Sequence, residues 1–126
     1  MANVTNYSTY ATVGGSETFH KLANSFYNRV SDDPLLRPLY PSSMEHAANQ
    51  LALFLIQFFG GPGDYSAANG EPRLRMRHAQ FHIGKAERDS WLGHMLFAID
   101  EVGIAEPSRT VMRRYFVDVS EFLINS

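Results

Sequence analysis

The side chain with the clearest chemical potential is His78, which lies in the segment PRLRMRHAQFHIG between Met76 and Phe81. A neutral imidazole nitrogen among such apolar neighbours can bind a metal ion. Most histidines are not ligands, however, and an isolated one more often packs in a core. The segment by itself therefore leaves two interpretations open, a metal ligand and a packing residue.

Few other motifs carry chemistry. Glu17 and His20 have Glu-x-x-His spacing, but a di-iron bundle needs two such pairs, so this one indicates a solvated first helical turn. The HExxH, GxSxG and GxxxxGK[ST] motifs are absent from the sequence. Arg73, Arg75 and Arg77 alternate, and on a helix they would spread around it instead of forming one phosphate-binding stripe.

The composition restricts the class of protein further. Of 126 residues, 44% are hydrophobic and 19% charged, which is typical of one soluble globular domain spanning residues 1–126. Without cysteine the chain has no disulfide, Cys-ligated metal site or thiol nucleophile, and a cytoplasmic location is expected. The net charge of −2 and the lack of a long apolar run disfavour nucleic-acid and membrane partners.

Hydrophobic periodicity predicts an all-α fold with four long helices. Apolar residues recur at the i, i+3, i+4 and i+7 spacing of one helix face in four segments, and no alternating strand pattern is present. A short element is also expected around Tyr7 to Thr12. The four helices are expected to run from residue 16 to near 32, from about 42 to 60, from 84 to 103, and onward from 107 or 108.

Local signals predict how these helices begin and what joins them. Ser16 is the expected N-cap of the first, and Ser42 with Glu45 has capping-box spacing before the second. Three prolines restrict DPLLRPLYP to a tight turn or two that carries Leu35, Leu39 and Tyr40 inward. Residues 60–72 have no period and many turn-forming side chains, so they are expected to form a long loop that is at least partly ordered.

The order of several segments resembles one protein family. The segments are TVGGSETFHKLANSFYNRV, DPLLRPLYP, FFGGPGDYS, GEPRLRMRHAQFHIG and ERDSWLGHM. They are similar to the group II (O group) truncated haemoglobins from about Tyr10 to the last helix. The resemblance implies a truncated globin fold, a two-over-two helical sandwich around one haem b (iron protoporphyrin IX).

The resemblance also implies which residues contact the haem. His78 matches the proximal ligand of the iron, and Arg77 is placed to meet a haem propionate, with Tyr65 as a second candidate. Further haem-contacting positions match Met76, Phe81, Ala47, Leu51 and Leu55.

On the distal side, the ligand-stabilising positions of the family match Tyr27, Tyr40 and Trp91. Each of these carries a hydrogen-bond donor on an aromatic body, although Tyr27 and Trp91 could also be plain packing residues. Ala47 matches the place of the distal histidine in conventional globins, and a methyl group cannot donate a hydrogen bond. Of the other histidines, His46 and His94 are expected at the surface or in packing.

The resemblance therefore implies a haem protein that binds O₂ and other diatomic ligands, with tight distal hydrogen bonding that favours retention or redox chemistry over delivery. One alternative is a nitric oxide dioxygenase or peroxidase-like enzyme, which would need a separate electron-donating reductase. Others are a ligand-retaining sensor or store, and a haem-free helical interaction module. The expected assembly is a monomer or a homodimer.

Overall fold

The computed structural model describes residues 9–126, and these residues are helical without any strand. The all-α prediction is therefore confirmed. Four long helices form the frame: α2 (Ser16–Ser31), α3 (Met44–Phe58), α6 (Lys85–Val102) and α7 (Ser108–Phe122). Three short elements connect them: η1 (Arg37–Leu39), α4 (Asp64–Asn69) and α5 (Leu74–His78). Of the element expected around Tyr7 to Thr12, residues 9–12 are helical and the rest lies outside the described residues.

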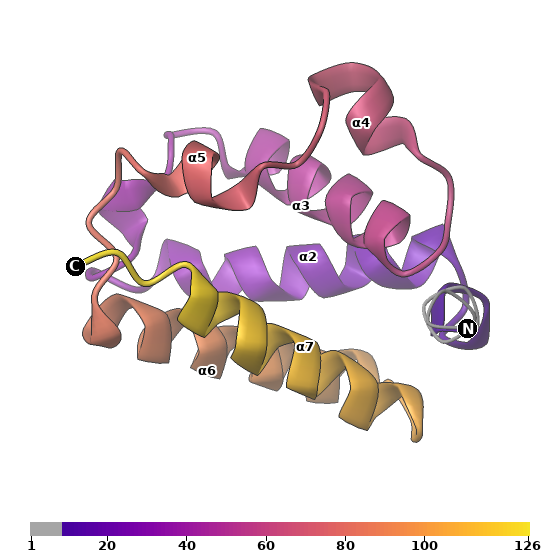
Figure 1. The fold of residues 1–126 in the computed structure, drawn as a ribbon. Coiled ribbons are helices and arrows are strands. Elements are labelled where there is room, and N and C mark those ends of the chain that lie inside the picture. Colours follow the sequence, from indigo (N-terminus) through magenta and orange to yellow (C-terminus); the bar gives the residue numbers. More distant parts are fainter. Residues whose placement is uncertain (1–8) are drawn as a thin grey trace.

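The long helices form two pairs that share one core. α2 packs against α3 and α6, and α6 packs against α7 (Figure 1). The side chains that fill the space between them share the predicted apolar stripes and have no exposed surface or almost none. The largest are Phe19, Leu22, Phe26, Phe59, Met95, Ile99, Met112 and Phe116. The periodic stripes thus predicted the helices and the face that α2 buries. For α3 the predicted face is wrong: the helix buries Ala48, Ala52 and Ile56, and of its predicted stripe only Leu55 is fully buried.

Two of the expected helix caps are wrong. Gly15 is the N-cap of α2, with a φ of 73° that favours glycine, while the Ser16 hydroxyl forms a 2.8 Å hydrogen bond with the Tyr10 hydroxyl. Ser43 is the N-cap of α3 and no side chain caps that helix, so Ser42 forms no capping box. By contrast Gly103 ends α6 in the left-handed conformation, with a φ of 83°, as its position predicted.

The connections also differ from the sequence prediction in detail. Residues 60–72 are not a plain loop, because they contain α4, which buries Tyr65. Gln57 holds this helix to α3: its side chain accepts a hydrogen bond from the Ser66 N–H at 2.9 Å and donates to the Ser66 hydroxyl at 2.7 Å. Such long-range contacts leave no periodic signal in a six-residue helix.

In the proline-rich turn before α3, the inward residue is Leu36, which is 2% exposed, and not Leu35, which is 42% exposed. The Asp33 carboxylate accepts hydrogen bonds from the backbone N–H groups of Leu35 at 2.8 Å and Leu36 at 3.4 Å. These bonds fix the backbone of the turn and so determine which leucine points inward. Among residues 9–126, no helix has the length and apolar character needed to cross a membrane.

Candidate functional site

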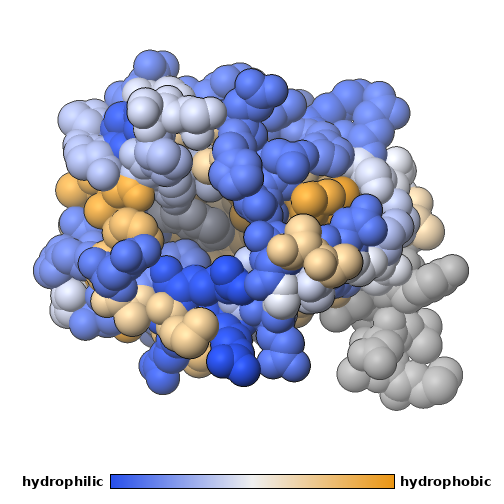
Figure 2. All heavy atoms as spheres, turned by 90° about the horizontal axis from the view of Figure 1, so that it is seen from above, coloured by the Kyte–Doolittle hydropathy of each residue, from blue (hydrophilic) through white to orange (hydrophobic). Residues whose placement is uncertain are grey.

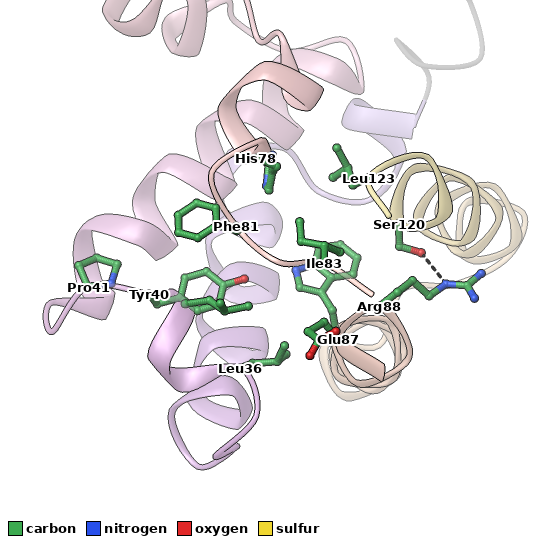
Figure 3. A pocket seen from close by; sticks show the side chains of 12 residues that line it. Leu36, Tyr40, Pro41, His78, Phe81, Ile83, Glu87, Arg88, Ser120 and Leu123 are labelled. Atoms are coloured by element: carbon green, nitrogen blue, oxygen red, sulfur yellow. Dashed lines mark hydrogen bonds between the residues drawn. The ribbon is translucent and has the colours of Figure 1, made fainter. Parts of the chain in front are cut away.

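A half-open cavity of about 240 Å³ lies where η1, the segment from α5 to α6, and the two helices α6 and α7 meet. Its walls are mainly apolar and carry several hydrogen-bonding groups (Figure 3). The apolar lining comprises Leu36, Leu39, Pro41, Phe81, Ile83 and Leu123, and the polar lining comprises Tyr40, His78, Glu87, Arg88, Trp91 and Ser120. Seen from the side of α4 and α5, the surface is hollowed beside apolar side chains (Figure 2).

His78 is the last residue of α5, and its ring extends into the cavity (Figure 3). The His78 Nδ1 atom lies 2.7 Å from the carbonyl oxygen of Leu74, one helical turn earlier. Because a carbonyl can only accept, Nδ1 must carry the hydrogen of this bond. In a neutral imidazole the lone pair is then on Nε2, and this is the tautomer in which a histidine binds a metal through Nε2.

Three aromatic side chains that carry a hydrogen-bond donor form a polar triad on the opposite wall: Tyr27, Tyr40 and Trp91. Tyr40 is the central member, because polar interactions with both Trp91 and Tyr27 lower its pKa against the larger effect of burial. The Tyr40 ring meets the Tyr27 ring edge to face at 5.3 Å. Burial raises the pKa of both tyrosines well above the ordinary value of 10, so both hydroxyls keep their protons.

The chemistry of the triad limits what each member can do. The Trp91 N–H can only donate, whereas each tyrosine hydroxyl can donate or accept. Tyr40 lines the cavity and keeps its proton, so its hydroxyl is the one that an acceptor in the cavity would meet. The cavity thus offers one imidazole nitrogen, one directed hydroxyl and an apolar lining.

The family of the chain follows from its similarity to known proteins. The model of a family described as bacterial-like globin matches residues 8–124. The chain belongs to this family. It is 41% identical over 90 residues to the group 2 truncated hemoglobin YjbI of Bacillus subtilis (strain 168), an alignment that covers 71% of this chain and 68% of that protein.

Solved structures agree with this assignment. The hemoglobin of the thermophilic phototrophic bacterium Chloroflexus aurantiacus superposes with a TM-score of 0.92 at 48% identity, covering 94% of this chain and 98% of that one. The group II truncated hemoglobin of Bacillus anthracis gives 0.90 at 30% identity, covering 94% and 91%. The two helix pairs are thus the two-over-two sandwich of a group II truncated haemoglobin, as the sequence predicted.

A globin of this family binds haem b, and O₂ and other diatomic ligands bind at the haem iron. The residues of the cavity fit that cofactor. Among residues 9–126, no group of three or more His, Asp or Glu side chains is arranged to hold a metal ion. A porphyrin supplies four nitrogen ligands itself and needs only one imidazole and an apolar slot. Family membership and this cavity both disfavour the haem-free interaction module.

The globin brings four of the predicted site residues into the cavity lining: Tyr40, His78, Phe81 and Trp91. Tyr27 is not among the described residues that line the cavity, and its ring lies behind that of Tyr40. Tyr40 lies in a proline-rich turn, where no periodic signal indicates the direction of a side chain.

The remaining predicted residues on the proximal side lie outside the lining. The Arg77 guanidinium donates to the carbonyl oxygens of Pro72 at 2.6 Å, Asn69 at 2.7 Å and Glu71 at 3.1 Å. Tyr65 is buried beneath it, with the guanidinium carbon 5.9 Å from the ring centre. Met76 is 60% exposed. Arg77 and Tyr65 therefore brace the loop before α5 in this structure.

On α3, Ala47 and Leu51 are half-buried and pack against the core, and Leu55 is 1% exposed within it. None of these three is among the described residues that line the cavity. Their predicted haem contacts stay predictions that a haem-bound structure would test.

Three polar lining residues, Glu87, Arg88 and Ser120, were missed by the sequence reasoning. Arg88 donates to the Ser120 hydroxyl at 3.2 Å, across the α6–α7 contact (Figure 3). Arg88 brings a cation to the edge of the cavity, where a cofactor with carboxylate groups needs one. The fixed ERD-x-W motif was the available signal, since it puts Arg88 three residues before Trp91.

His94 has a packing role, as expected, but in a polar cluster. Its Nε2 atom lies 2.7 Å from an Asp33 oxygen, and its Nδ1 accepts a hydrogen bond from Arg29 at 3.1 Å. The Ser90 hydroxyl donates to the same Asp33 oxygen. These hydrogen bonds, with Ser90 as the largest contributor, lower the pKa of the Asp33 carboxyl from 3.8 to about 2. The cluster joins α6 to the turn that leads into η1, and so joins the two elements that carry Trp91 and Tyr40.

Proposed function

We propose that this globin holds bound O₂ tightly and uses it in place, in redox chemistry or as a retained ligand, and does not deliver it. His78 is the proximal ligand in this proposal, and Tyr40 is the direct distal donor. The observation that carries it is the triad, in which Tyr40 and Trp91 bring hydrogen-bond donors to the cavity wall and the Tyr27 ring packs against Tyr40 at 5.3 Å.

The energetic argument concerns the charge on the bound ligand. Haem iron supplies electron density to a ligand, and a hydrogen bond to a charge-bearing acceptor contributes about 1.5 to 3 kcal/mol. Since 1.4 kcal/mol is a factor of ten, one such bond slows ligand release by about 10- to 100-fold. Rapid delivery, as an oxygen transporter requires, is disfavoured by such slow release.

The proximal part of the proposal rests on the tautomer of His78. The Leu74 carbonyl takes the Nδ1 hydrogen and fixes the ring, so Nε2 is ready to ligate. A visible spectrum of the purified protein with added hemin tests this. We expect a Soret band in the wild type and weak, easily lost haem in His78→Ala. An unaltered spectrum and unaltered haem retention in His78→Ala would refute the assignment.

Nitric oxide dioxygenation is the second candidate, because an oxygen ligand that is retained has time to react. The chain has no recognisable nucleotide-binding motif, so the electrons must come from a separate reductase. Repeated nitric oxide consumption with a reductant present would favour the enzyme, and a single turnover would favour a store or sensor. We further propose that it works in the cytoplasm as a monomer or a homodimer, because a chain without cysteine suits a reducing compartment.

A further inference from the structure

The short helix α5 has no buried side chain. Packing against other helices therefore does little to fix its position, although it carries the residue that is to ligate the iron. On its N-terminal side the three hydrogen bonds of Arg77 to the preceding loop hold it. What holds its C-terminal side is a separate question, because the last carbonyl groups of a helix have no partner within the helix.

The turn after α5 satisfies part of this need, because the Phe81 N–H donates to the His78 carbonyl at 3.0 Å, and the segment that follows α7 adds further contacts. The Asn125 N–H donates to the Ile83 carbonyl at 2.8 Å, and the Asn125 side-chain oxygen accepts from the Ile83 N–H at 2.9 Å. The Asn125 side-chain amide nitrogen donates to the carbonyl of Phe81 at 2.9 Å and to the carbonyl of His78 itself at 3.3 Å. One asparagine thus contacts both the end of α5 and the segment that leads from α5 to α6.

The chemistry of these partners fixes which way the amide points. Ile83 presents an N–H, which requires an oxygen, and Phe81 and His78 present carbonyls, which require an N–H. Only an amide satisfies both requirements at once. Arg75 adds a second contact between the same parts of the chain, since its guanidinium carbon lies 4.5 Å above the Phe122 ring.

We propose that Asn125 is a positioning residue for His78. The Asn125 amide donates to the His78 carbonyl, and the His78 ring donates to the Leu74 carbonyl. His78 is therefore held both at its backbone and at its ring. The inference rests on the proposed ligation of iron by His78. Outer contacts of this kind commonly change metal affinity by about 10- to 100-fold when they are removed.

The test compares Asn125→Ala and Asn125→Asp with the control Asn24→Ala, an exposed asparagine on α2, in the haem-loaded protein. Asn125→Asp is nearly isosteric but sets a carboxylate oxygen against two carbonyl oxygens, so it should have the larger effect. The readouts are the iron–histidine stretching band in the Raman spectrum of the ferrous protein and the rate of haem transfer to an excess of a scavenger apoglobin. We expect a shifted or broadened band and about tenfold faster haem loss in both Asn125 variants, and wild-type behaviour in Asn24→Ala.

A second comparison separates positioning from general destabilisation. In the variant His78→Gly, free imidazole takes the place of the histidine side chain as the iron ligand. The ligand is then no longer bonded to the backbone. Adding Asn125→Ala to this variant should then leave the iron–imidazole band unchanged, whereas the same substitution shifts the band when His78 is intact.

Two results would overturn the inference. One is an unaltered iron–histidine band in both Asn125 variants. The other is that Asn125→Ala shifts the band equally in the protein with His78 and in His78→Gly with free imidazole. The absence of an iron–histidine band in the wild type would instead refute the ligation by His78. The two failures are therefore distinguishable.

Discussion

The distal triad makes a quantitative prediction about O₂ release. Tyr40→Phe removes the hydroxyl whose proton is available to the cavity, while it keeps the aromatic body that lines the wall. Loss of one hydrogen bond to a charge-bearing ligand is worth about 1.5 to 3 kcal/mol, which speeds release by about 10- to 100-fold. Trp91 lines the same wall and its N–H can still donate to the ligand, so the lower end of the range is expected for Tyr40→Phe alone.

The neighbours of Tyr40 should behave differently from one another. The Tyr27 ring lies behind that of Tyr40, so Tyr27→Phe should speed release by only about 2- to 5-fold and should add almost nothing in a Tyr40→Phe background. Tyr40→Phe with Trp91→Phe removes both donors of the cavity wall, and release should then be about 10²- to 10⁴-fold faster than in the wild type.

Stopped-flow displacement of O₂ by carbon monoxide measures these rates directly. Met112→Leu, a volume-conserving change in the core between α6 and α7, is a control that should leave release nearly unaltered. Equal and additive effects of Tyr27→Phe and Tyr40→Phe on the rate of O₂ release would contradict the placement of Tyr27 behind Tyr40. An unaltered rate in the double variant of Tyr40 and Trp91 would refute the assignment of this wall as distal.

Three further predictions concern stability. A Cβ at Gly61 would lie 2.5 Å from the Tyr10 ring, so Gly61→Ala should lower the free energy of unfolding by about 1 to 3 kcal/mol. Gly93 in α6 has open space around the same position, so Gly93→Ala should raise the free energy of unfolding by about 0.5 to 1 kcal/mol. Urea unfolding measures both changes. The lowered pKa of Asp33 contributes stability that is present above its ordinary pKa of 3.8 and is lost as the pH falls towards 2. Asp33→Asn should therefore cost up to about 2 kcal/mol near neutral pH and much less at about pH 2, where the native carboxyl is half protonated, as measured by unfolding at the two pH values. Burial raises the pKa of Tyr115 above 10, so its ionisation in an absorbance titration should coincide with alkaline unfolding, and an earlier phenolate signal from it would contradict this.

The long helices could be predicted from the sequence because their burial leaves a period. Phe19, Leu22 and Phe26 repeat at helical spacing, and each is fully buried where α2 meets its neighbours. The helix starts were predicted less well. Ser16 has the residue type of an N-cap, but the positive φ of Gly15 decides where α2 begins. Residue type favours a cap, and backbone conformation decides it.

The candidate site could be predicted only in part, for a physical reason. His78 and Trp91 sit in segments with distinctive residues at fixed spacing, and the resemblance identified both. Leu36 and Ser120 line the same cavity, but their side chains are directed by a turn and by contacts between helices, which no local pattern records. The structure adds contacts that the sequence did not predict for Arg77, whose guanidinium donates to three backbone carbonyls, and its propionate contact stays a prediction.

The two walls of the cavity are both held in place by polar contacts and not by buried side chains of their own. Neither η1 nor α5 buries a side chain within its own span, and each is held to the helix frame by a polar cluster. On the distal side the cluster is centred on Asp33, which receives hydrogen bonds from α6, and on the proximal side it is centred on Asn125. Elements with few buried apolar contacts open with lower free energy than the core does. We therefore expect amide hydrogen exchange in η1 and α5 to slow strongly when haem fills the cavity, while exchange in the buried turns of α2 changes little. Equal protection of all three elements before and after haem addition would show that the walls are as rigid as the frame.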